Sequence, residues 1–194
     1  LALLKEAGWS LKGRQLVNDK TGEPFTTELI DGSPITERFA LPYAESLKRI
    51  GIELSFRLVD SSAMTERERK FDYDMIAHVW GQSLSPGNEQ REFWSSASAD
   101  REGSQNFAGI SDPAIDKLVD KVIFAPDRET LVAATHALDR ALLWNHYVIP
   151  QWYSGVDRYV YWDRFGRPEN LPEFSFGFPS IWWFDPAKAA RITK

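Results

Sequence analysis

Two amphipathic helices in series, between Gly103 and Tyr153, place the strongest constraint on the fold of this sequence. The first helix is expected to begin at Ser111-Asp112-Pro113, because such residues satisfy or remove the free N–H groups of a first turn. Its apolar residues recur every three or four positions and form one stripe: Ile115, Leu118, Val119, Val122 and Ile123. A stripe of this kind predicts a helix that packs one face on a core.

The second helix is predicted to start after Asp127, which can cap it. The face expected to point inward carries Leu131, Ala134, Leu138, Ala141 and Asn145. The apolar segments 148–153 and 156–162 that follow are predicted to be strands.

Strands and helices also alternate in the first half of the chain. Residues 24–31 and 52–59 show the alternation typical of strands, and a helix expected from Ser33-Pro34 to Gly51 should be kinked or split at Pro42. The apolar run within 71–80 predicts a strand that is covered on both faces, as in parallel sheets. The sequence therefore predicts an α/β lobe over 1–162, with a mixed sheet flanked by helices, and an aromatic-rich tail over 163–194.

Composition disfavours several classes of function. Acidic residues number 28 against 23 basic ones, and no basic cluster indicates a nucleic-acid partner. The chain has no cysteine, and its 3 histidines lie at no metal-binding spacing. Motifs for nucleotide cofactors or a nucleophile elbow are missing from the sequence. We therefore expect no metal, no cofactor and no catalytic residue.

Ligand contacts are expected at the carboxyl end of the predicted 71–80 strand, where open α/β sheets bind their ligands. The loop 81–88 begins there. Asn106 has an alternative role in holding a turn, and Trp152 an alternative role in core packing. The candidate ligand-binding residues are Trp80, Gln82, Ser83, Asn106, Phe107, Trp152 and Tyr153.

Four motifs in order carry a resemblance to a known family. They are LLKEAGW at the start, LKRIGIEL at 47–54, FDYDM at 71–75, and NFAGISDPAIDKLVD followed by RALLWNHYVIPQWY. The chain resembles the family 5 extracellular solute-binding proteins of ABC importers, of the peptide- and nickel-binding type. YWDRFGRPENLP and WWFDPAKAA are similar to the subgroup associated with oligopeptide and microcin C uptake.

The resemblance implies a periplasmic-binding-protein-like fold of type II, of which this chain would be most of the C-terminal lobe. The tail 163–194 would pack on that lobe or on an N-terminal lobe outside this chain. The implied partners are a peptide-like solute, the transmembrane permease subunits of an ABC importer and the N-terminal lobe. The implied location is the periplasm or the outer cell surface, and the implied role is binding without catalysis.

One departure from the family bears on the ligand. Peptide-binding relatives place an aspartate in the loop after the FDYDM-type strand, where it receives the ammonium of the peptide, and the matching position here is about Ser83. The loop 81–88 holds no acid, although Glu89 lies close by. An ammonium buried there would lack its charge partner, which favours a blocked, modified or longer peptide.

Two other functions stay open from the sequence. The 8 tryptophans would suit a sugar-binding receptor of the same fold, because indole faces stack on pyranose rings. A glycoside hydrolase domain would need acids such as Asp72, Asp74 and Asp157.

Overall fold

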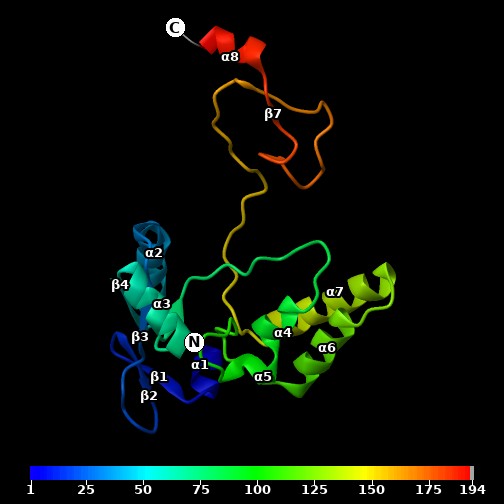
Figure 1. Cartoon of the computed structure of the whole chain (residues 1–194). Helices are drawn as coiled ribbons and strands as arrows, with labels where there is room; N and C mark the ends of the chain where they lie inside the picture. The colour runs from blue at the N-terminus through cyan, green and yellow to red at the C-terminus, as the bar shows by residue number, and fades with distance from the viewer. Residues whose placement is uncertain (193–194) are drawn as a thin grey trace. The chain divides into compact units, whose positions relative to one another are not determined.

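The computed structural model describes residues 1–192 and divides the chain into two compact units, Leu1–Ile149 and Pro150–Lys194 (Figure 1). None of the described helices is long and apolar enough to cross a membrane. The assignment of 1–162 to a lobe and of 163–194 to a packed tail stays a prediction.

The first unit opens with a short helix and a hairpin. Helix α1 covers Ala2–Glu6, and strands β1 (Trp9–Lys12) and β2 (Gln15–Asn18) pair antiparallel. Gly8 follows α1 with a φ of +83°, a left-handed conformation that glycine adopts without steric cost. Glycine at this position therefore allows the turn that separates α1 from β1.

The sheet of this unit is parallel and has three strands in the order β4-β3-β5. Strand β3 (Thr26–Asp31) pairs along its whole length with β4 (Glu53–Leu58). Strand β5 (Met75–Ile76) pairs with β3 only at Leu29 and Ile30. The strand predicted over 71–80 is thus wrong for most of its length. Strand β3 ends at Asp31, which in this register lies opposite Ala77, so the residues from His78 onward find no β3 backbone to pair with.

Helix α2 connects β3 to β4 and covers the sheet. A short 3₁₀ turn, η1 (Pro34–Thr36), precedes α2 (Glu37–Lys48), and the Ser33 hydroxyl caps the turn. The helix runs on through Pro42, which corrects the expected split. Fully buried Ala40 packs with Leu29 and Leu54, so a small residue lets α2 approach the sheet closely.

Helix α3 (Ser61–Lys70) begins at Asp60, whose carboxylate accepts hydrogen bonds from the N–H groups of Ser62 and Ala63. Hydrogen bonds from the Ser62 hydroxyl, the largest contribution, and from these N–H groups lower the pKa of the Asp60 carboxylate below its usual value. Asp60 therefore satisfies two N–H groups of the first turn of α3.

A helical layer forms the rest of the first unit. It contains α4 (Glu89–Trp94), α5 (Ser96–Ala99), α6 (Pro113–Ile123) and α7 (Arg128–Trp144), and α6 runs beside α7 (Figure 1). Asp112 and Asp127 cap α6 and α7 as predicted, each accepting a backbone N–H at 2.7 Å. The buried cluster joins both helices to α4: Phe93, Trp94, Ile110, Ile115, Val119, Val122, Ala134 and Leu138. The predicted stripes are confirmed, except that Asn145 is exposed at the end of α7.

The second unit is held by aromatic rings. Strands β6 (Phe165–Gly166) and β7 (Trp183–Phe184) pair antiparallel, and α8 spans Pro186–Ile192. The Tyr159 ring stacks on the ring of Phe176 with centroids 3.8 Å apart, and the Trp182 ring packs on Phe176 with centroids 4.5 Å apart. The strands predicted over 148–153 and 156–162 are wrong, because these residues form no strand in the described chain.

Candidate functional site

The loop 81–88 is held at its start and in its middle by side chains that bind backbone oxygens. The indole Nε1 of Trp80 donates to the Gln105 oxygen at 3.0 Å. The guanidinium of Arg128 donates to the Leu84 oxygen at 2.6 Å. These contacts fix a segment that has no strand or helix of its own.

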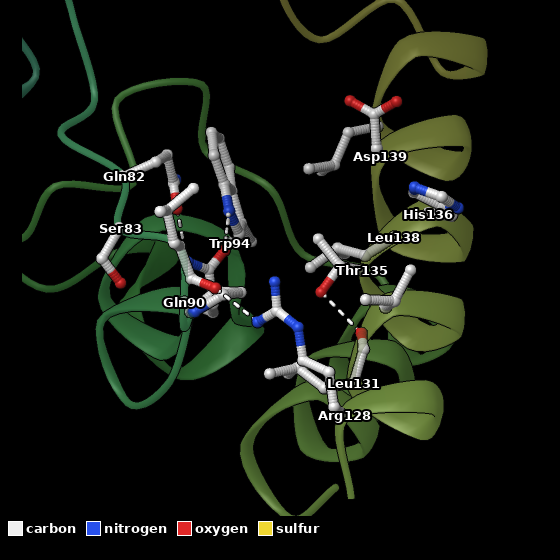
Figure 2. Close-up of a pocket in the computed structure, with 14 residues that line it drawn as sticks. Gln82, Ser83, Gln90, Trp94, Arg128, Leu131, Thr135, His136, Leu138 and Asp139 are labelled. Carbon is white, nitrogen blue, oxygen red and sulfur yellow. Dashed lines mark hydrogen bonds between the residues drawn. The ribbon is translucent and has the colours of Figure 1, made fainter. Parts of the chain in front are cut away.

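A cavity of about 340 Å³ lies between this loop, helix α4 and helix α7 (Figure 2). The loop supplies Gln82 and Ser83, and α4 supplies Gln90 and Trp94. The opposite wall comes from α7: Arg128, Leu131, Thr135, His136, Leu138 and Asp139. The volume is at the lower end of the range for small-molecule sites, and apolar walls with a few polar groups are typical of them.

Gln90 connects the loop 81–88 to Trp94 on helix α4. Its side chain is 4% exposed. Its amide nitrogen donates to Gln82 Oε1 at 2.8 Å, and its oxygen accepts the indole N–H of Trp94 at 3.0 Å. A buried amide with such partners is a rigid support for the loop, since breaking its bonds would leave polar groups without partners.

Glu89 is used within the protein. Its Oε1 accepts the Gly87 N–H at 2.8 Å and the amide of Gln90 at 3.2 Å. Burial would raise the pKa of Glu89, but these hydrogen bonds together lower the pKa below its usual value. The carboxylate is therefore ionised at neutral pH and closes the turn of the loop.

Aromatic rings support the start of the loop. Trp80 packs on Trp94 with ring centroids 5.0 Å apart, and Phe107 lies 4.2 Å from the ring of His78. The Tyr73 hydroxyl donates to the Phe107 oxygen at 2.9 Å. Burial, and secondarily the negative charge of Glu68, raises the pKa of Tyr73 to about 12. Trp80 and Phe107 are both half-buried at this position.

Asn106 holds the turn before α6. Its side chain is 0% exposed. The amide donates to the Ser95 oxygen at 3.0 Å and to the Ile110 oxygen at 2.9 Å, and Oδ1 accepts the Ile110 N–H at 2.8 Å. Of the two roles considered for Asn106, these hydrogen bonds describe the one in the turn.

Trp152 and Tyr153 belong to the second unit and do not line this cavity. Their side chains are 67% and 89% exposed. Trp152 is thus mostly exposed in the described structure, and the choice between its two roles stays a prediction.

The acids that a hydrolase would need are placed differently from a catalytic pair. The Asp72 carboxylate lies 3.5 Å from the guanidinium of Arg67, and the Asp74 carboxylate accepts the Glu28 N–H at 3.0 Å beside the sheet. Asp157 belongs to the second unit. No group of three or more potential metal ligands occurs among residues 1–192.

The α7 wall of the cavity was missed by the sequence reading. Arg128, Thr135 and Asp139 follow one another at helical spacing, beside the apolar stripe that packs on α6. This second stripe was the available signal, but a polar stripe on a helix is usually a solvated face.

Residues 1–102 match the model for bacterial extracellular solute-binding proteins, family 5 Middle.

Several curated relatives align with nearly the whole chain. A protein y4wM of Sinorhizobium fredii is 57% identical over 183 residues, which are 94% of this chain and 28% of that protein. The probable peptide-binding protein YejA of Agrobacterium fabrum is 53% identical over 181 residues, 93% of this chain and 30% of that protein. The peptidoglycan-binding protein YepA of the same organism is 39% identical over 180 residues, 93% of this chain and 29% of that protein. The chain thus spans less than a third of the length of these relatives.

Solved structures show the same fold. The oligopeptide-binding protein AppA of Bacillus subtilis, in complex with a nonapeptide, has a TM-score of 0.65 at 25% identity, over 75% of this chain and 29% of its own. A periplasmic oligopeptide-binding protein of Thermotoga maritima with bound mannohexaose has a TM-score of 0.66 at 21% identity, over 79% of this chain and 30% of its own. The predicted α/β fold of the periplasmic-binding type II class is confirmed.

Proposed function

The chain belongs to the family 5 bacterial extracellular solute-binding proteins, and on that premise we propose that it forms one lobe of a two-lobed receptor for a peptide-like solute. The observation that carries the proposal is the cavity beside the loop 81–88, which follows the carboxyl end of β5. Relatives named as peptide-binding and a related structure with a bound nonapeptide support the same ligand class.

Ligand contacts are proposed at the loop and at the rings beside it. Trp80, Gln82, Ser83 and Phe107 would contact the ligand from the first unit, with Asn106 holding the turn behind them. Trp152 and Tyr153 would add exposed aromatic surface from the second unit.

The ligand is proposed to be a blocked, modified or longer peptide. The loop has no acid to receive a free ammonium, and Glu89 is occupied by the Gly87 N–H and Gln90. A short peptide with a free amino end would therefore leave a desolvated positive charge near Ser83.

The mechanism is proposed to be lobe closure. A ligand that contacts both lobes stabilises the closed state by its differential affinity for that state. The loaded receptor would then deliver the solute to the permease subunits of an ABC importer, in the periplasm or at the outer cell surface. The chain alone would bind the ligand weakly, because it keeps only part of the contacts.

Catalysis is not part of the proposal. Asp72 and Asp74 serve a salt bridge and a backbone N–H at the sheet, and neither lines the cavity. A sugar-binding receptor is the second candidate, favoured by the mannohexaose in the Thermotoga maritima structure and by the exposed Trp152 ring.

Titration calorimetry of the full-length receptor tests the proposal. Peptides of two to nine residues, with free and with blocked amino ends, are compared with mannohexaose. We expect micromolar or tighter binding of blocked or longer peptides, and weaker binding by the isolated chain. Gln82→Ala should weaken peptide binding, while Gln15→Ala, outside the cavity, should not. Binding of the sugar but of no peptide would refute the proposal.

A further inference from the structure

A chain of three side chains fixes the direction of the Gln82 amide. The indole N–H of Trp94 donates to Gln90 Oε1 at 3.0 Å, and Gln90 Nε2 donates to Gln82 Oε1 at 2.8 Å. An indole nitrogen only donates, so the oxygen of Gln90 has to face Trp94 and its nitrogen has to face the loop. The orientation of both amides therefore follows from one donor-only group.

Glu89 imposes the same orientation from another side. Gln90 Nε2 also donates to Glu89 Oε1 at 3.2 Å. Glu89 is an acceptor only, because its pKa lies below the usual value and the carboxylate is ionised. Turning the Gln90 amide around would break three hydrogen bonds in a buried place.

These hydrogen bonds determine which part of the Gln82 amide is available to a ligand in the cavity. With its oxygen engaged, Gln82 offers an amide nitrogen that has no partner among residues 1–192. Arg128 lines the same cavity, donates once to the Leu84 oxygen and forms no ion pair within the described chain (Figure 2). Gln82 and Arg128 therefore present N–H donors and a positive charge to the cavity.

Nearby acids do not cancel this character. Asp139 lines the cavity about 16 Å from Arg128 along α7, from the rise of 1.5 Å per residue, which is beyond the Debye length of about 8 Å at physiological salt. Asp127 and Glu129 flank Arg128 in sequence but do not line the cavity, and the Asp127 carboxylate caps α7.

We propose that the end of the cavity between Gln82 and Arg128 binds a carboxylate of the peptide-like ligand, and that Gln90 is the positioning residue that sets this preference. The inference rests on the proposed function, since it names the ligand group that one part of the site takes. A primary amide in place of the carboxylate loses the charge, and its NH₂ group would meet the N–H donors. A hydrogen bond to a charged group contributes enough binding free energy to make the affinity for the carboxylate about tenfold or more higher than the affinity for the amide.

Calorimetry on the full-length receptor tests the proposal with three forms of one peptide. One has a free carboxyl end, one has an amidated end, and one has an amidated end with a glutamate side chain. We expect the first to bind at least about tenfold more tightly than the second. Tight binding of the third identifies a side-chain carboxylate as the preferred group, and weak binding identifies the terminal one.

Four variants separate the parts of the proposal. Gln82→Glu removes the two donors and adds a negative charge, so it should abolish or reverse the preference for the free acid. Gln15→Glu makes the same change on an exposed residue outside the cavity and should leave the preference unchanged. Gln90→Leu and Trp94→Phe release the amide of Gln82 and should bring the two affinities toward equality.

Thermal melts of both supporting variants identify a folded one for the binding measurement. An unchanged ratio of the two affinities in a folded Gln90→Leu or Trp94→Phe variant would overturn the positioning role. Equal affinities of the wild-type receptor for all three peptides would overturn the carboxylate site alone. Failure to bind any peptide would overturn the proposed function and this inference together.

Discussion

Replacing Asn106 by alanine should be among the most destabilising changes in the first unit. The substitution removes the acceptor of the Ile110 N–H and the donor to the Ile110 oxygen, and Ile110 is fully buried. The Ser95 oxygen loses less, because it also accepts the Ser98 hydroxyl at 2.8 Å. Two buried backbone groups without partners cost about 1 to 3 kcal/mol each. We therefore expect a loss of about 3 to 4 kcal/mol.

Urea unfolding, followed by tryptophan fluorescence, measures this loss in the 194-residue chain. The urea concentration at the midpoint of unfolding should fall, while the slope of the free energy of unfolding against urea concentration stays constant. The melting temperature should drop by about 10 °C. Asn106→Asp keeps the acceptor but places an oxygen against the Ile110 oxygen, so it should cost at least as much.

Asn145→Ala serves as the control. Asn145 is exposed and donates one bond, to the Ala141 oxygen, so its loss should stay below about 0.5 kcal/mol. A loss of less than about 1 kcal/mol for Asn106→Ala would refute the structural role derived for this side chain.

Two further predictions concern the sheet and the rings beside it. Gly51→Ala should lower the free energy of unfolding in urea by at least about 2 kcal/mol, because φ is +83° and a Cβ would lie 2.5 Å from the Leu16 nitrogen. The control Gly13→Ala, with a φ of +66° and open space around the new Cβ, should cost only about 1 kcal/mol. Equal losses for the two variants would contradict this prediction. The pKa of Tyr73 is raised to about 12, so its contribution to stability is complete below pH 10 and is lost as pH rises to 12. Because the ring is partly exposed, the loss is on the order of 1 kcal/mol, and Tyr73→Phe should flatten the pH profile there; an unchanged profile would contradict it.

The helices could be predicted from the sequence because their signals are local. Asp112 and Asp127 cap α6 and α7 at the expected positions, and the Ile115 stripe packs as predicted. A cap and an apolar stripe both depend on residues within one or two turns, so no distant partner has to be known.

The predictions of strands were wrong where a strand depends on a partner that is distant in the sequence. The apolar run after Met75 fits a sheet by its residue types, but β3 ends at Asp31, and Val79 is 86% exposed. Strand propensity reflects the fit to a neighbouring strand more than a backbone preference, so the segments 148–153 and 156–162 misled in the same way.

Half of the candidate site could be predicted. Gln82 and Ser83 were found because ligand-binding loops follow strand ends in α/β sheets, and both line the cavity. Arg128 and Asp139 were not found, because only the packing of α7 on α6, which also packs on α4, places them opposite the loop. The role of Gln90 needed hydrogen-bond directions, which no sequence pattern contains.

The anchoring of the loop 81–88 has a consequence for how this protein can diversify. Trp80 and Arg128 bind the loop and its neighbourhood through the backbone oxygens of Gln105 and Leu84. A backbone oxygen is present whatever side chain stands at the position, so mutations at 84 and 105 leave both anchors in place. Selection for a new solute can therefore change the exposed loop side chains in single steps, while the first unit, which carries them, keeps its fold.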